Sequence, residues 1–161
     1  MIVRITITLL IGMVCQVSYG EESLCSGKEK IVFSCHVDKK MVSLCRPIDS
    51  PRELIYRFGN AGKPEMTYPG PKDRNEFYRS DAPLFGGGIT TLAFVRGDYE
   101  YRLYSKIGRE ESTGTSEERI PEFEDGVVVS KSGKQLKHLI CDDGGEGFRE
   151  DIGWVPLHSQ N

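Results

Sequence analysis

Four cysteines beyond residue 20 have the clearest chemistry in this sequence: Cys25, Cys35, Cys45 and Cys141. Cysteine thiolates act as nucleophiles or ligate zinc, but no two of these residues have the C-x-x-C spacing of zinc and redox motifs. An even number of cysteines in an exported chain instead favours disulfides, which leave no thiolate to react. We therefore expect two disulfides, for which the sequence allows three pairings.

The three histidines, His36, His138 and His158, are far apart in the sequence. A catalytic histidine needs a partnered nucleophile or acid. The sequence has no G-x-S-x-G elbow, H-E-x-x-H pair, P-loop or dinucleotide fingerprint. It therefore predicts a protein that is not an enzyme, with no catalytic residue, no metal ligand and no cofactor.

Residues 1–20 have the pattern of a signal peptide. Arg4 gives a positive start, residues 5–14 are apolar but too few to span a bilayer, and Ser18 and Gly20 are small residues at a cleavage site. Lipidation at Cys15 is disfavoured by the bulky residues before it. The sequence thus predicts export to the periplasm or the extracellular space, with no stable membrane span.

The net charge of the chain indicates which classes of macromolecule it is suited to bind. The chain has 21 basic and 24 acidic residues, for a net charge of −3. A mildly acidic protein is a poor ligand for nucleic acid, whose phosphates attract basic surfaces. The same charge favours a basic protein partner.

Alternation of apolar and polar residues predicts strands along most of the remaining chain. Residues 31–37 and 41–45 form the first expected hairpin, and a third strand follows at residues 54–58. Two further hairpins have their turns at residues 96–98 and at Ser132-Gly133. In the strand that starts at residue 99, Tyr99, Tyr101 and Leu103 are expected to face the core.

These segments and two shorter ones predict an all-β fold. We expect an antiparallel meander of about eight strands that closes into a small barrel or sandwich and is stapled by disulfides. The domain covers residues 21–161. It includes an acidic loop near 109–125 and a C-terminal tail, 142–161.

Tyrosine and arginine often anchor protein interfaces. The sequence predicts an exposed sheet face shared by Tyr68, Tyr78, Tyr104, Arg57 and Arg102. The alternative is that these tyrosines cover the core with the ring and leave only the hydroxyl in water.

Several short motifs resemble known families. Phe33-Ser34-Cys35, Val42-Ser43-Leu44-Cys45, the segment 55–59 (IYRFG) and Cys141 resemble a family of small exported proteobacterial proteins, a likeness that implies no particular activity. The aromatic-x-Cys start and the late cysteine are also similar to the periplasmic and membrane-bound inhibitors of c-type lysozyme.

The second resemblance implies an exported β-barrel that inserts a Ser-Gly-x-x-Tyr loop into the lysozyme cleft. Here Ser132-Gly133 is followed by Lys134-Gln135-Leu136, without the tyrosine, so the inhibitory residues do not carry over. The resemblance also implies a Cys35–Cys141 and a Cys25–Cys45 disulfide. A Cys35–Cys45 bond across the first hairpin remains open.

These observations favour an exported, non-enzymatic binding protein that inhibits a cell-wall hydrolase or a toxin. The expected partner is a basic hydrolase or toxin. The expected partner-binding residues are Ser132, Gly133, Tyr104, Arg102, Arg57, Glu117 and Glu118. The alternative is a small-molecule or metal-binding β-barrel, which an interior filled by Phe33, Tyr56, Phe58, Tyr101 and Leu103 would exclude as a lumen site. An enzyme with an unfamiliar carboxylate pair ranks third.

Overall fold

The computed structural model describes residues 23–109, 121–142, 144 and 146–158. Nine antiparallel strands in two sheets make up the fold of this part of the chain. Across the same residues, no helix is long and apolar enough to cross a membrane. The predicted signal peptide and residues 110–120 of the predicted acidic loop lie outside the described residues.

The first sheet is a meander of four strands in the order β1-β2-β3-β4. The predicted first hairpin is present, with Asp38 in its turn at a φ of 54°. Pro69-Gly70-Pro71 follows the fourth strand, and because proline cannot donate to a ladder the meander ends there. The strands are β1 (Glu29–Val37), β2 (Lys40–Pro47), β3 (Ile55–Asn60) and β4 (Lys63–Tyr68).

The second sheet has five strands in the order β5-β6-β7-β8-β9. β7 and β8 extend further into the predicted acidic loop than the sequence indicated, since they pair as far as Arg109 and Pro121. The strands are β5 (Tyr78–Leu84), β6 (Gly87–Arg96), β7 (Tyr99–Arg109), β8 (Pro121–Lys131) and β9 (Lys134–Ile140).

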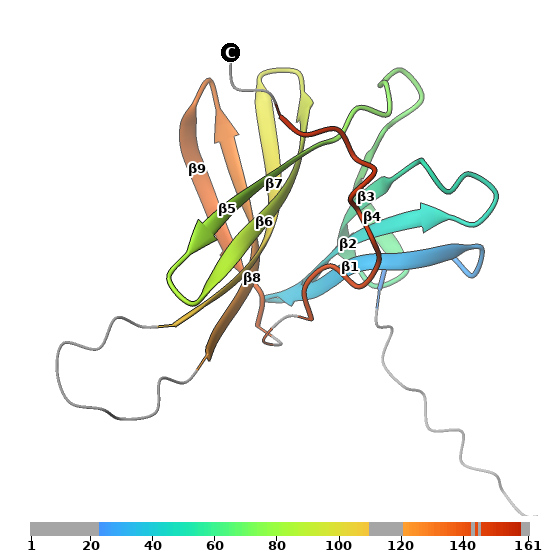
Figure 1. The fold of residues 1–161 in the computed structure, drawn as a ribbon. Coiled ribbons are helices and arrows are strands. Elements are labelled where there is room, and N and C mark those ends of the chain that lie inside the picture. Colours follow the sequence, from blue (N-terminus) through green and yellow to red (C-terminus); the bar gives the residue numbers. More distant parts are fainter. Residues whose placement is uncertain (1–22, 110–120, 143, 145, 159–161) are drawn as a thin grey trace, which may run out of the picture.

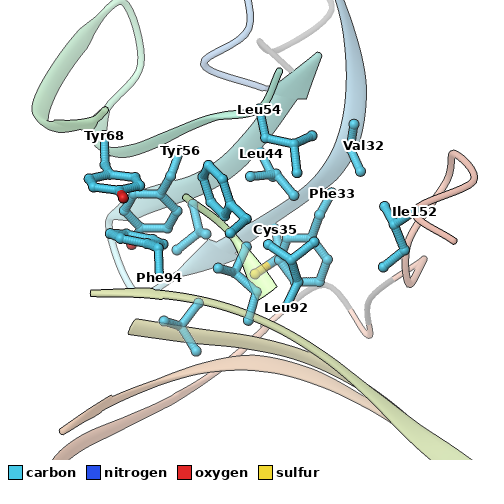
Figure 2. Packing of buried hydrophobic residues seen from close by; sticks show 14 of the residues in the cluster. Val32, Phe33, Cys35, Leu44, Leu54, Tyr56, Tyr68, Leu92, Phe94 and Ile152 are labelled. Carbon is cyan, nitrogen blue, oxygen red and sulfur yellow. The ribbon is translucent and has the colours of Figure 1, made fainter. Parts of the chain in front are cut away.

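The two sheets pack against each other as a sandwich (Figure 1). The all-β prediction is confirmed, and of its two forms the structure has the sandwich, not the closed barrel, because β4 does not pair with β5. Phe94 of β6 lies at the centre of the core, with its ring stacked 4.1 Å from Tyr68 and 4.9 Å from Tyr101 between centroids. Figure 2 shows Phe94 packed beside Tyr68 and Tyr56. Of the five residues expected to fill the interior, Phe33, Tyr56 and Leu103 are buried, whereas Phe58 and Tyr101 are only partly buried.

The C-terminal tail packs on its own sandwich. Its Arg149 N–H donates to Val32 O of β1 at 2.8 Å, and farther along Pro156 O accepts from Arg79 N of β5 at 2.8 Å. Ile152 and Val155 are buried in the core. The tail, coloured red in Figure 1, therefore covers backbone at both edge strands β1 and β5, which limits pairing with other chains.

Two disulfides join the four cysteines, as predicted. Cys25 bonds to Cys45, and Cys35 bonds to Cys141, each with a Cα–Cα distance of 5.5 Å. These are the pairings that the lysozyme-inhibitor resemblance implies. The Cys35–Cys45 alternative is wrong because the strand register places Cys35 opposite Val42 and Cys45 opposite Ile31.

A buried ion pair fixes the start of the described chain to the outer face of the first sheet. Arg57 donates to both oxygens of Glu29, with Nη1–Oε2 at 2.7 Å and Nη2–Oε1 at 2.9 Å. Arg57 also donates to Leu24 O at 3.3 Å. Bidentate pairs of this kind are among the stronger charge-assisted hydrogen bonds.

This ion pair makes the fold sensitive to acid. Burial raises the pKa of the Glu29 carboxyl, but hydrogen bonds from Arg57 and Ser26 and the arginine charge outweigh burial, so the pKa lies below its ordinary value of 4.5. A lowered folded pKa contributes stability above the unfolded value, and that contribution is lost as the pH falls through the folded value. We expect the free energy of unfolding from urea titrations to fall below about pH 4.5, and to fall less steeply in Glu29→Gln. Equal slopes for the two proteins would contradict this assignment.

Candidate functional site

Two turns lie side by side at one end of the second sheet (Figure 1). The β8–β9 turn has positive φ at both Ser132 (47°) and Gly133 (76°), as a two-residue turn matched to strand twist requires. Ser132 N donates to Asp98 O of the β6–β7 turn at 3.3 Å, which ties the two turns together. We call this feature the hairpin tip: Asp98, Tyr99, Lys131, Ser132 and Gly133.

An exposed tyrosine belongs to the hairpin tip. Tyr99 pairs with Lys131 across β7 and β8, and Lys131 Nζ lies 5.1 Å from the Tyr99 ring centroid. The sequence placed Tyr99 in the core with Leu103, but Tyr99 is 38 % exposed. It lies at the start of β7, at the edge of the packed core, and lines a cavity there. Tyr99 thus lies beside the Ser132-Gly133 turn, although no tyrosine follows this turn in the sequence.

An apolar groove begins next to the hairpin tip and runs between the sheets. It forms a cavity of about 250 Å³ between β3 and β4 on one side and β7, β8 and β9 on the other. Among the described residues, its one charged lining residue is Lys137. The others are Tyr56, Phe58, Met66, Tyr99, Tyr101, Val129, Leu136 and Leu139. We call this cavity the intersheet groove.

Both walls of the intersheet groove contain a β-bulge. On β9 the register shifts opposite Val129 and Ser130, which leaves Leu136 as the extra residue beside Lys137. Between β3 and β4 the pairing shifts from Phe58–Met66 to Gly59–Pro64, which leaves Glu65 of β4 as the extra residue. Gly59 has a φ of 151°, and a Cβ there would lie 2.5 Å from Glu65 N. Bulges of this kind redirect side chains, and here residues beside both bulges line the groove.

The intersheet groove adjoins a second cavity of about 460 Å³ with a basic lining. The two cavities share Phe58, Lys137 and Leu139, and the second adds Val37, Asp38, Lys39 and Lys40. Lys40 is already paired with Glu65 at 2.5 Å. Lys39 and Lys137 form no ion pair with the part of the chain that the structure describes.

The predicted partner-binding residues do not gather at one place. Ser132 and Gly133 form the hairpin tip. Arg57 lies on the first sheet, bound to Glu29. Glu117 and Glu118 lie outside the described residues. The predicted shared face is wrong for Arg57 and for Tyr68, which is buried in the core.

Arg102 and Tyr104 do share the outward face of the second sheet. Arg102 Nε lies 3.4 Å from Glu100 Oε2, and its side chain is 42 % exposed. Tyr104 is only 5 % exposed, and its hydroxyl lies 2.8 Å from Glu124 Oε1 and 2.7 Å from His138 Nε2. Burial, and then the Glu124 carboxylate, raise the pKa of Tyr104. Tyr104 therefore fixes neighbouring strands and offers a partner little surface.

A polar cleft of about 550 Å³ lies between the second sheet and the tail. Its carboxylates are each engaged with a separate partner. Asp81 pairs with Arg79, Glu146 with Arg149, Glu150 with Arg46 and Lys30, and Asp151 accepts from Gly153 N. Each of these four carboxylates therefore has its own charged or hydrogen-bonding partner.

One group of side chains has the composition of a metal site. The sulfurs of Cys25 and Cys45 and the carboxylate of Glu29 lie within 4.8 Å of one another. The two sulfurs form a disulfide, so neither is a thiolate that could ligate a metal.

The fold and the site define a class of protein: an all-β, disulfide-linked sandwich with a projecting hairpin tip and an apolar groove beside it. The chain matches no known family, no curated protein and no solved structure.

Proposed function

We propose that this protein is an exported, non-enzymatic binding protein of the periplasm or extracellular space that inhibits a cell-wall hydrolase or a toxin. The hairpin tip carries the proposal, because it places an exposed tyrosine beside two small turn residues. The disulfides are consistent with export.

The hairpin tip is suited to enter a cleft because it is stiff. Its two turns are bonded to each other, and its strands belong to a sheet of five. A loop that is already ordered loses less conformational entropy on binding than a flexible one. Tyr99 adds the kind of side chain that most often dominates interface energies.

Charge also supports a hydrolase as the partner. Most glycoside hydrolases hold two carboxylates in their clefts. Lys131 of the hairpin tip and Lys134 at the start of β9 outnumber Asp98, so the tip and the residue that follows it have a net positive charge toward such a cleft. The whole chain has a net charge of −3, which favours encounter with an enzyme that is basic overall.

We expect the oxidised chain 21–161 to bind a c-type lysozyme or another basic cell-wall hydrolase and to slow lysis in a turbidity assay. Tyr99→Ala is expected to weaken binding by about 30-fold, the loss typical of an interface anchor. The matched control is Phe123→Ala, because Phe123 is also an exposed aromatic of the second sheet, at 60 %, and lies in β8 far from the tip. Absence of binding to every hydrolase tested at low salt, or equal losses in the two variants, would contradict the proposal.

A further inference from the structure

The intersheet groove and the cavity that adjoins it differ in polarity. The first is lined by aromatic and aliphatic side chains with one lysine, and the second has Lys39, Lys40 and Lys137 against the single carboxylate of Asp38. Because the cavities share three lining residues, an elongated molecule could occupy both. Its apolar part would lie between the sheets and its charged part among the lysines.

We propose that this composite site binds a single-chain anionic lipid. The acyl chain lies in the intersheet groove and the anionic headgroup lies between Lys39 and Lys137. This site shares Tyr99 with the hairpin tip, but its two headgroup lysines are not part of the tip.

The lining of the intersheet groove fits an apolar chain. The bulge on β9 adds Leu136 to the groove wall, where it remains 49 % exposed, and Tyr99 at the other end is 38 % exposed. Such apolar surface in water is unfavourable, and an acyl chain would cover it. Each buried CH₂ is expected to raise the affinity by up to about fourfold, until the groove is full.

The lysines of the second cavity determine which sign of headgroup charge is favoured. Lys40 is compensated by Glu65, whereas Lys39 and Lys137 have no ion pair with the described part of the chain. Asp38 lines the same cavity and its N–H donates to Asp142 Oδ2, so the positive charge available to a ligand is that of these two lysines. An anionic headgroup is therefore favoured over a cationic one.

The same features argue against an added peptide strand. β9 is an edge strand, but it carries Lys134 and Lys137 and a bulge opposite Val129. Lysines and bulges on an edge hinder pairing with another strand. A lipid needs no backbone pairing, so these features do not oppose it.

The test is calorimetric titration of the oxidised chain 21–161 with decanoate below its micellar concentration. We expect decanoate to bind, shorter carboxylates to bind progressively more weakly, and acetate and decyltrimethylammonium not to bind. In protein labelled with ¹³C at the methionine methyls, decanoate should shift Met66, which lines the groove, and leave Met41 unchanged, because Met41 is buried on the first sheet outside the groove.

The charge assignment is tested with the double variant Lys39→Glu/Lys137→Glu. Its affinity for decanoate should fall at least about tenfold, whereas Lys72→Glu, an exposed lysine between β4 and β5, should bind as the wild type does. The proposal is overturned by no decanoate binding, by equal binding of the cationic amphiphile, or by a shift at Met41 without one at Met66. Displacement of decanoate by an acidic peptide that binds more tightly would reassign the groove to a protein. The double variant keeps the hairpin tip intact and should still bind lysozyme, so decanoate binding and lysozyme binding can fail separately.

Discussion

Replacing Cys35 and Cys141 together by alanine is expected to lower the free energy of unfolding by about 4 to 5 kcal/mol. The bond closes a sequence separation of 106 residues, and in the chain-entropy account long loops gain most from a cross-link. It also joins β1 of the first sheet to the residue that follows β9 of the second. Both sulfurs are buried, at 2 % and 7 % exposure for their residues, so a small packing loss adds to the effect.

The Cys25–Cys45 bond is the matched control, because its separation is only 20 residues. Its removal by the same two substitutions should cost about 3 kcal/mol. Equilibrium unfolding in guanidinium chloride, followed by circular dichroism, gives both values. A larger loss for the short loop than for the long one would show that local contacts around Cys25, and not loop closure, dominate.

Phe94→Ala is expected to destabilise the fold by about 3 to 5 kcal/mol, the range for removing a buried phenylalanine. Phe94 is fully buried and contacts aromatic rings from both sheets. Tyr68 and Tyr56 of the first sheet lie 4.1 and 5.0 Å from its centroid, and Tyr101 of the second lies at 4.9 Å. Aromatic pairs in such geometry stabilise beyond their buried area. The loss of one ring therefore weakens the contact between the sheets.

Urea titration of Phe94→Ala beside Phe123→Ala tests this role. Phe123 is 60 % exposed, so its substitution should change the free energy of unfolding by less than about 0.5 kcal/mol. If Phe94→Ala cost less than about 1 kcal/mol, the sheets would have to be held together mainly by other contacts. A lower urea slope in Phe94→Ala would indicate that the two sheets no longer unfold together.

The sequence alone determined the strands and the chemistry of the cysteines. Alternation over residues 31–37 and 41–45 predicted the first hairpin because a period of two is a local property of the extended chain. Ser132-Gly133 likewise predicted a tight turn, since few residue types accept two positive φ values. The leader pattern and the even number of cysteines predicted disulfides without any knowledge of the fold.

Only the tertiary structure decided which surfaces remained free. Tyr68 and Tyr104 were predicted to be exposed. Tyr68 is instead covered by Phe94, and Tyr104 is enclosed by side chains of the neighbouring strands. The two-residue period of a strand predicts that successive side chains face opposite sides of the sheet, but it does not predict what packs against each side. The same limit applies to Tyr99, which is on the predicted face but at the edge of the packed core.

The candidate site was the least predictable part, because it depends on register and on contacts between distant segments. Leu136 enters the groove wall through a one-residue shift that no local pattern signals. Lys39 and Lys137 come from opposite sheets and meet at the second cavity. The amino-acid sequence therefore determined the strands, the turns and the presence of disulfides, which follow from local conformational preference and from redox chemistry. The division into two sheets, the hairpin tip and the intersheet groove were decided by tertiary packing, since each arises where residues far apart in the chain come into contact.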